Sequence, residues 1–322
     1  MTPTTGKSPK RQRAGAASVL AVLAMIVTMS ACGSPSGPRA IPTKPPPTPS
    51  SSSTPAADAS AAPTPVATLI AVGDIAVCDA EGDEATGSLV ARLDPEATVA
   101  TLGDLAYPDG SEQTYSECYD PVWGAWKDRT RPALGNHDVF LDGGQAYAAY
   151  FGDAAGTPGE GWYSYDLGAW HVVVLNSNCR LIGCGEGSEQ LTWLTADLAQ
   201  HPATCTLAYW HHPRFSSGRH GDDEDVAPLW DALVAADADV LLVGHDHLYE
   251  RFAPRDGLRA FTVGTGGGPL TEVEHLDAGS EVTIDNSYGV LELTLRPDGY
   301  DWRFLEADAE AAAADIGSTD CH

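Results

Sequence analysis

Short runs of apolar and β-branched residues recur along the chain from residue 66 onward, and each run ends in polar residues. The clearest runs occupy residues 66–74, 97–104, 171–178, 204–212 and 239–247. Continuous apolar runs of this length predict strands that are buried on both faces, as in the centre of a mostly parallel sheet.

Two helices are predicted between these strands. Residues 188–200 have a helical pattern that begins at Ser188, a favourable N-cap, and a second helical pattern begins at Asp225. After residue 258 strand-like segments predominate, and the sequence RPDG at 296–299 favours the turn of an antiparallel hairpin. This order of elements predicts an α/β fold with a sheet core, parallel in its first half and antiparallel in its second.

Residues 1–31 have the layout of a secretory signal peptide. A basic stretch precedes a small and apolar run at 14–31, and the sequence MSAC, which ends at Cys32, resembles the cleavage site of a bacterial lipoprotein. Met29 stands where such signals usually carry Leu. The alternatives are cleavage without a lipid and an uncleaved anchor, although the run is short for a membrane-spanning helix. Residues 32–65 are rich in Pro, Ser, Thr and Ala, which predicts an extended tether.

Charge and composition narrow the choice of partners. The 322 residues carry a formal charge of −27, so the chain repels nucleic acid and we expect no nucleic-acid partner. A hydrophobic fraction of 43% with eight Trp residues predicts a packed core after the tether.

The cysteines predict disulfides. Six of the seven lie beyond Cys32, and an even number in an exported domain favours pairing. Cys179 and Cys184 enclose only four residues and form the first predicted pair. The pairing of the other four stays open: Cys78, Cys118, Cys205 and Cys321.

Carboxylate and imidazole side chains lie at the carboxyl ends of the predicted strands. They are Asp74, Asp104, His211, His245 and His247. Ligands of open α/β sheets bind at this edge, so we expect the five side chains to lie close together. His245 and His247 are two positions apart, and in an extended segment such side chains point the same way.

Two further side chains extend this set. Tyr107 follows Asp104 in the sequence GDLAY, and Asn136 begins the sequence NHD after another predicted strand. Seven oxygen and nitrogen donors are too many for one tetrahedral zinc ion, but they suit two ions that share a carboxylate. The mixture of donors favours transition metals over Ca²⁺ or Mg²⁺.

Some of these residues also have structural explanations. Asp74 and Asn136 could be turn residues, and Tyr107 could pack beside its neighbouring proline. His211 and His212 are adjacent, so on a strand their side chains point apart, and we expect one ligand and one residue that either packs in the core or supports the ligands from behind.

The remaining histidines and a glycine run have no clear place in the site. The sequence GTGGG at 264–268 lacks the Lys of a phosphate-binding P-loop and predicts a close-packed turn near the metals. Four histidines lack a setting of this kind and are expected at the surface: His171, His201, His275 and His322.

The motifs together resemble a known family. The series GD, GDLAY, GNHD, a strand ending in His211, and GHDH closely resembles the calcineurin-like metallophosphoesterases over roughly residues 66–265. GDLAY and GHDHLYER look most like the purple acid phosphatase branch. The resemblance implies a four-layer α/β sandwich of two mixed β-sheets flanked by helices, with one catalytic domain over 66–322.

The resemblance also assigns the metal ligands. One ion would be held by Asp74, Asp104, Tyr107 and His247. The other would be held by Asp104, Asn136, His211 and His245. In the family the tyrosine-bound ion is Fe³⁺ and its partner is Zn, Mn or Fe²⁺. A phenolate is a hard anionic donor, which agrees with ferric iron.

Two further histidines are assigned to catalysis by the same resemblance. His137 would act as general acid or as a donor to the phosphate, and His220 would contact substrate. Two departures from the family pattern stand out. Gly221 replaces a second histidine beside His220, and Ala76 replaces the usual glycine after Asp74.

The resemblance implies an exported dinuclear-metal phosphatase that hydrolyses small phosphate monoesters by attack of a metal-bound hydroxide. It would be a cell-surface lipoprotein or a secreted protein, with membrane contact only through a lipid at Cys32. One alternative is a phosphodiesterase acting on nucleotides or lipid headgroups, decided by the cleft around Tyr115, Trp123, Trp126 and His220. Another is a non-catalytic surface protein that binds metal or phosphate.

Overall fold

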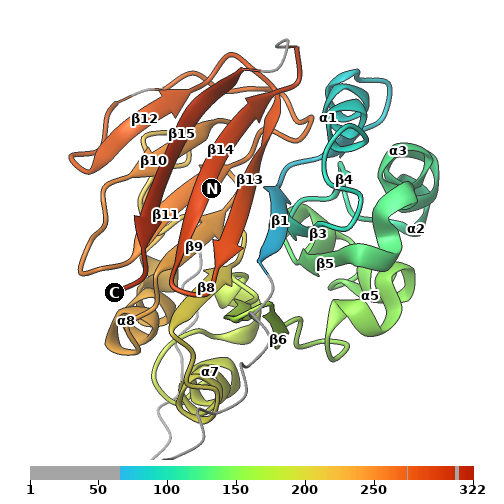
Figure 1. Ribbon diagram of the computed structural model, residues 1–322. Helices are drawn as coiled ribbons and strands as arrows, with labels where there is room; N and C mark the ends of the chain where they lie inside the picture. The colour runs from blue at the N-terminus through green and yellow to red at the C-terminus, as the bar shows by residue number, and fades with distance from the viewer. Residues whose placement is uncertain (1–65, 274, 309–311) are drawn as a thin grey trace, which may run out of the picture. The chain divides into compact units, whose positions relative to one another are not determined.

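The computed structural model describes residues 66–273, 275–308 and 312–322. These residues form two large mixed β-sheets with helices outside them (Figure 1). The predicted signal peptide at 1–31 and the tether at 32–65 lie outside the described residues. Within the described part, no helix is both long and apolar enough to cross a membrane.

The first sheet has six strands in the order β15-β14-β13-β1-β3-β5. Its strands β1, β3 and β5 are parallel, with β5 at the edge, and β13 to β15 form an antiparallel extension beside β1. The RPDG hairpin turn is confirmed between β13 and β14, where Arg296 pairs with Gly299. The bounds are β1 (Ala67–Val72), β3 (Thr98–Leu102), β5 (Thr130–Ala133), β13 (Gly289–Arg296), β14 (Gly299–Glu306) and β15 (Ala313–Asp320).

The second sheet has seven strands in the order β12-β10-β11-β9-β8-β7-β6. Strands β7, β8, β9 and β11 are parallel, and β6, β10 and β12 are antiparallel to their neighbours. Its strands are β6 (Tyr163–Leu167), β7 (Trp170–Val174), β8 (Cys205–Tyr209), β9 (Val240–Val243), β10 (Tyr249–Phe252), β11 (Arg259–Val263) and β12 (Ser280–Ile284). A third, two-stranded sheet joins β2 (Ala76–Val77) to β4 (Ala106–Tyr107).

Helices cover the parallel part of the first sheet and the outer face of the second. The first packs against α1 (Gly82–Val90), α3 (Asp120–Trp123), α4 (Asn136–Phe140) and α5 (Gln145–Phe151), with α2 (Glu112–Thr114) beside α5, and the second packs against α6 (Cys179–Ile182), α7 (Glu189–Gln200) and α8 (Ala227–Ala235). Helix α7 begins after Ser188 as predicted, because the Ser188 hydroxyl accepts a hydrogen bond from the backbone NH of Leu191. Helix α8 begins two residues after Asp225, behind the short 3₁₀ turn η4 (Glu224–Val226).

The two sheets share one core, which explains the continuous apolar runs. In β1, Leu69 and Ala71 face the second sheet, while Ile70 and Val72 pack against the helices. A strand between two apolar layers needs no polar face, so its sequence does not alternate. All five predicted runs are strands: β1, β3, β7, β8 and β9.

The described domain contains three disulfides, one local and two between distant segments. The predicted Cys179–Cys184 bond is present and closes the α6 turn. The other two bonds are Cys78–Cys118 and Cys205–Cys321, and the second fixes the end of the chain to β8.

Candidate metal centre

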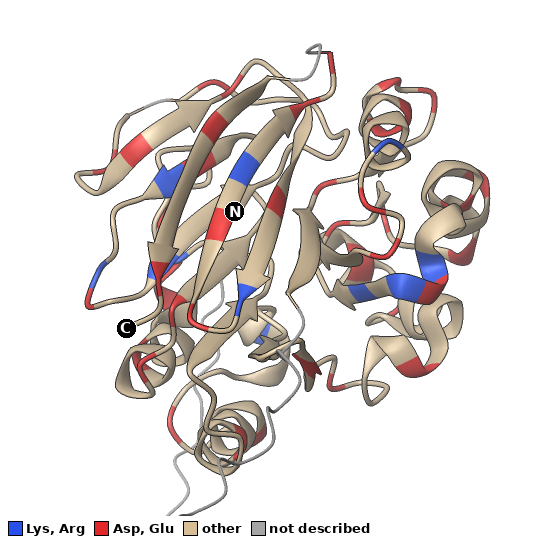
Figure 2. Cartoon of the chain, viewed as in Figure 1, with Lys and Arg blue, Asp and Glu red and all other residues tan. Residues whose placement is uncertain are grey.

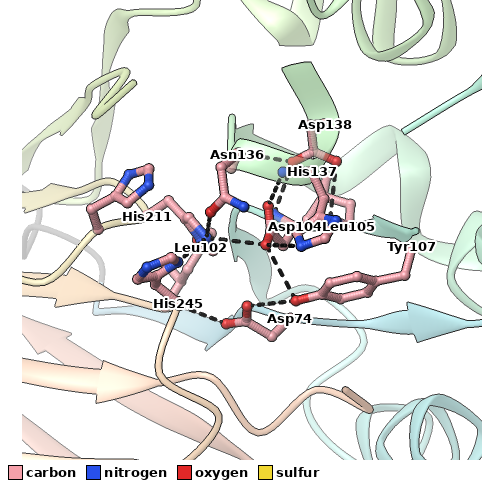
Figure 3. A network of polar contacts seen from close by, with 12 residues as sticks. Asp74, Leu102, Asp104, Leu105, Tyr107, Asn136, His137, Asp138, His211 and His245 are labelled. Atoms are coloured by element: carbon pink, nitrogen blue, oxygen red, sulfur yellow. Dashed lines mark hydrogen bonds and ion pairs between the residues drawn. The ribbon is translucent and has the colours of Figure 1, made fainter. Parts of the chain in front are cut away.

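The predicted ligands converge at the carboxyl ends of the parallel strands (Figure 3). Asp74 follows β1, Asp104 follows β3 and His211 follows β8. His245 follows β9, and Asn136 begins α4 just after β5. The parallel strands of both sheets therefore end around one point, as the sequence predicted.

The backbone at this point is strained. Asp74, Asp104 and His245 have φ values of 59°, 52° and 73°, in the left-handed region. Residues other than glycine rarely adopt this conformation, and Asp and His do so more readily than bulky residues. Three such residues in one cluster fit the general concentration of backbone strain at functional sites.

The glycines of the motifs give the backbone room beside the ligands. A Cβ atom added at Gly135 would overlap the Asp104 carboxylate, and one added at Gly244 would lie 2.6 Å from Oδ2 of Asp74. The GTGGG segment behaves in the same way, because a Cβ at Gly268 would lie 2.8 Å from the His247 ring. That segment is the close-packed turn predicted from the sequence.

Four of the seven predicted ligands form one half of the cluster. The phenol oxygen of Tyr107 lies 2.9 Å from Oδ1 of Asp74 and 3.2 Å from Oδ2 of Asp104. It also lies 3.0 Å from Nε2 of His247, which is 3.3 Å from Oδ1 of Asp74. Tyr107 is thus a member of the site and not a packing residue beside Pro108.

The other predicted ligands form the second half around His211. Nε2 of His211 lies 3.1 Å from Oδ1 of Asn136, 3.3 Å from Oδ2 of Asp104 and 3.2 Å from Nδ1 of His245. The same Asp104 oxygen, Oδ2, therefore faces both halves. Its other oxygen, Oδ1, accepts a 2.7 Å hydrogen bond from the backbone NH of His137.

Backbone carbonyls orient two of the histidines for ligation. Nδ1 of His211 lies 2.9 Å from the carbonyl of Leu102, and Nδ1 of His247 lies 2.8 Å from that of Pro269. A carbonyl only accepts, so Nδ1 carries the hydrogen in both rings. Nε2 then keeps a free lone pair directed into the cluster, as in protein metal sites generally.

The electrostatics of the cluster favour cations. Burial alone would lower the pKa of His211, but Asp104 outweighs it and raises that pKa to about 9. Burial also opposes charge on His247, yet Asp74 raises its pKa to about 8. The pKa of the Tyr107 phenol is raised by burial and then by Asp74 and Asp104. The buried carboxylates thus hold protons on their neighbours where no metal balances them.

Asp138 is a structural residue of the site that the sequence did not reveal. It is fully buried and accepts hydrogen bonds from the backbone NH groups of Asp104, Leu105 and Gly135 and from the hydroxyl of Tyr115. It therefore ties the loop after β3 to the loop after β5. Its position as the last residue of the GNHD motif, next to two predicted site residues, was the one sequence feature that could have indicated it.

A cavity of about 580 Å³ opens beside the second half of the cluster. Asn136, His212, His220 and His245 line its inner part. Nδ1 of His220 lies 3.0 Å from Oδ1 of the buried Asp246, so the carboxylate orients the ring. The predicted placement of His220 at a substrate-binding cleft agrees with this geometry.

His137 lies on the other side of the cluster. Its Nδ1 lies 2.5 Å from the carbonyl of Pro108, and its ring contacts that of Tyr107 at 4.6 Å between centroids. Nε2 is 3.9 Å from Oδ2 of Asp104. His137 is therefore beside the predicted metals, as expected, but it is not among the residues that line the cavity.

His212 also lines the cavity. Its ring does not point away from that of His211, but its place beside His211 fits the expected residue that supports the ligands. Both residues follow the end of β8, where strand geometry no longer separates them, and their rings are 5.0 Å apart. The hydroxyl of Ser177 accepts from the backbone NH groups of His211 and His212. Its own hydrogen is then free for Nδ1 of His212 at 2.8 Å, which leaves the hydrogen of the neutral ring on Nε2.

Other expectations need correction. Tyr115 and Trp123 are 1% and 0% exposed and belong to the core under α1, so they do not shape the cleft, and Trp126 packs beside them. His171 is buried and not at the surface, because α7 places Asp197 2.8 Å from its Nε2. The surface positions of the other three histidines are confirmed: His201, His275 and His322.

Comparison with known proteins agrees with this geometry. A model of the calcineurin-like phosphoesterases matches residues 67–249. Purple acid phosphatase 15 of Arabidopsis thaliana is 27% identical over 176 residues, which are 48% of this chain and 32% of that protein. The chain thus spans about a third of the length of this curated relative.

Solved structures share the fold. GAP50, described as the anchor in the inner membrane complex of Plasmodium, aligns with a TM-score of 0.66 at 16% identity over 80% of this chain and 89% of its own. The purple acid phosphatase PPD1 of yellow lupin, Lupinus luteus, aligns with a TM-score of 0.63 at 17% identity, over 80% and 54%. Both likenesses support the two-sheet architecture.

Proposed function

Because the chain belongs to the calcineurin-like phosphoesterase family, we propose that it is an exported phosphatase that hydrolyses phosphate monoesters at a dinuclear metal centre. Its likeness to purple acid phosphatases supports this proposal. The observation that carries it is the position of Asp104, whose Oδ2 faces Tyr107 on one side and His211 on the other. A carboxylate oxygen between two ligand sets is what a pair of metal ions requires.

The residues fit two transition-metal ions. Donor atoms of Asp74, Asp104 and His211 lie within 4.8 Å of one another, and the carboxylates are buried without a compensating Lys or Arg among their described partners. Tyr107 and His247 would complete the first ligand set, with Fe³⁺ at the phenolate. The second set would take Zn, Mn or Fe²⁺, and its remaining ligands would be Asn136 and His245.

Two such ions supply an activated water and offset the charge of the phosphoryl oxygens. The residues of the chain position the ester and handle the proton of the leaving group. The Nε2–H group of His212 donates into the cavity toward a phosphoryl oxygen. His220, held by Asp246, faces the leaving oxygen and supplies its proton. His137 lies on the side of the metal cluster away from the cavity and donates a hydrogen bond to the phosphate.

Inversion at phosphorus is expected. Among the described residues that line the cavity, Ser177 carries the one hydroxyl; it accepts two backbone NH groups and donates to His212. Direct attack of water on phosphorus gives inversion, whereas attack by Ser177 would form a phosphoserine and give net retention. A chiral phosphate ester hydrolysed with net retention would contradict a direct attack by water.

Export is part of the same proposal. Three disulfides in the described domain are typical of an oxidising compartment. The predicted signal and a lipid at Cys32 would place the enzyme at the cell surface. Acidic side chains predominate over the described elements (Figure 2), which supports small phosphoesters and not nucleic acid as partners.

Two alternatives have an observation in their favour. The cavity of about 580 Å³ has room for a second ester arm, which favours phosphodiesters. The likeness in fold to GAP50, described as an anchor, favours a non-catalytic protein. The three functions differ in which phosphate esters, if any, the chain should hydrolyse.

Hydrolysis by the purified full chain distinguishes these functions. We expect 4-nitrophenyl phosphate to be cleaved faster than bis(4-nitrophenyl) phosphate, with activity lost on chelation and restored by metal. The Asp104→Asn variant should lose on the order of 10³-fold in kcat/KM, and the exposed-residue control Asp153→Asn should match the parent. Faster diester cleavage would favour the second function, and no cleavage of either ester by the metal-loaded chain would favour the third.

A further inference from the structure

The cavity beside the metal centre has two chemically different walls. Phe140 and Leu181 are 76% and 67% exposed, and both line it together with Val139. Asp222 and Asp223 line it as well. Single exposed apolar side chains are common, but two that line the same cavity beside the candidate active site form the kind of patch that marks a ligand-binding groove, which favours an apolar ligand.

From this arrangement we infer that the substrates are monoesters of an apolar alcohol, alkyl or aryl, whose far end is neutral or cationic. This inference rests on the proposed phosphatase function and names its substrate class. The inner residues Asn136 and His245 belong to the ligand cluster, so the phosphate must lie at that end. The alcohol then extends outward between Phe140 and Leu181.

The apolar wall is held in place by covalent and local structure. Leu181 lies in α6, which the Cys179–Cys184 disulfide closes into a small ring. Phe140 is the last residue of α4, the helix that begins with the ligand Asn136. A wall that is already ordered loses little conformational entropy when a ligand binds, so little of the free energy of the apolar contacts is offset and they increase the affinity.

The charges of the cavity exclude anionic alcohols. Among the described residues that line it, Arg180 is the one Arg or Lys, and its Nε is already 3.0 Å from Oδ2 of Asp225. Asp222 and Asp223 have no Arg or Lys within 4 Å among the described residues. A second phosphate or a carboxylate on the alcohol would meet this acidic wall, whereas an ammonium group would be attracted.

A chain-length series tests the apolar wall at constant leaving-group chemistry. For the metal-loaded full chain, kcat/KM should rise on the order of tenfold from ethyl phosphate to hexyl phosphate. Burial of one methylene group strengthens binding about fourfold, and the apolar wall covers only part of the hexyl group. The double variant Phe140→Ala/Leu181→Ala should flatten this rise. Leu141→Ala removes a neighbouring leucine that is 61% exposed and does not line the cavity, so it should leave the rise unchanged.

A second pair of esters tests the acidic wall. We expect 6-aminohexyl phosphate to be cleaved about tenfold more efficiently than 5-carboxypentyl phosphate. Asp223→Asn should reduce this ratio while keeping the oxygen that accepts from the backbone NH of Asp225. The exposed Asp231→Asn in α8 is the matched control and should leave the ratio unchanged.

The outcomes separate this inference from the proposed function. Hydrolysis that does not depend on chain length, or that favours the carboxylate, would overturn the inference and leave the phosphatase proposal standing. If no ester is cleaved, the phosphatase proposal fails. Calorimetry with ethylphosphonate and hexylphosphonate then decides: tighter binding of the hexyl compound, lost in the double variant, supports the apolar wall, and equal binding overturns it.

Discussion

The phenol of Tyr107 lies 2.9 Å from Oδ1 of Asp74 and can donate its hydrogen to this fully buried carboxylate. Burial and the nearby carboxylates raise the pKa of the phenol, so it keeps this hydrogen unless a cation replaces it. The phenol oxygen of Tyr107 and the carboxylate of Asp74 can therefore hold either a hydrogen or a metal ion between them, but not both. The centre should load with release of protons and become tighter as the pH rises.

Loss of the negative charge of the shared carboxylate should release at least one of the two metal ions. In Asp104→Asn the amide cannot balance two cations, although it keeps the shape of the side chain. We expect the metal content to fall from about two ions per chain to one or fewer, and kcat/KM to fall on the order of 10³-fold. Metal analysis with initial rates checks this, and two retained ions would show that Asp104 is not the bridge.

The Ser177–His212 pair should act as a unit. His212→Ala removes the proposed donor to the phosphate, and we expect kcat to fall on the order of 10²-fold. Ser177→Ala removes the hydroxyl that keeps the hydrogen of the His212 ring on Nε2, and we expect kcat to fall about tenfold. If the account is correct, the double variant is no slower than His212→Ala alone, as a double-mutant cycle would show. Additive losses would mean that the two residues act separately.

Proton donation by His220 should depend on the leaving group. His220→Ala should slow the hydrolysis of alkyl phosphates on the order of 10²-fold, because a leaving alkoxide needs a proton. It should slow the hydrolysis of 4-nitrophenyl phosphate much less, because nitrophenolate leaves without one. Asp246→Asn should show the same pattern with a smaller amplitude. An equal loss for both types of ester would assign His220 to binding and not to proton transfer.

Asp83 should make the domain less stable as the pH rises. Burial, and then the nearby Glu84, raise the pKa of this carboxyl to about 7 in the folded protein. The folded state therefore binds the proton more tightly than the unfolded state, and the stability this provides below about pH 4 is lost as the pH approaches 7.

Replacement of Asp83 by a neutral isostere tests this dependence. Asp83→Asn should raise the free energy of unfolding at pH 8 by on the order of 2 kcal/mol and leave it nearly unchanged at pH 4. Urea unfolding at both pH values measures the difference, with the exposed Asp79→Asn as control. A variant that is equally stabilised at both pH values would point to packing as the cause.

The sequence predicted the buried strands and five of the seven candidate ligands for one physical reason. Strands covered on both faces produce continuous apolar runs, and the polar residue that ends each run stands at the edge where ligands bind. The outer strand β15 escaped notice because its sequence, AADIGSTD, carries few apolar residues. It pairs with one neighbour and leaves most of its side chains in solvent or partly covered.

The supporting residues could not be found in this way. Asp138 reaches the hydroxyl of Tyr115, and Ser177 reaches His212, through contacts between segments 23 and 35 residues apart. No local pattern records such a contact. The expected place of Tyr115, Trp123 and Trp126 at the cleft is wrong for the same reason, because their helical segments turn these side chains into the core.

The central claim is a dinuclear centre with a tyrosine-bound ferric ion, and one measurement addresses it directly. An absorption spectrum of the purified full chain is recorded together with metal analysis, for the parent protein and for Tyr107→Phe. We predict a broad visible band with about two metal ions per chain, and loss of the band in the variant. A colourless parent protein with two metal ions would contradict the tyrosine-bound ferric ion, and one that holds no metal after reconstitution would contradict the metal centre as a whole.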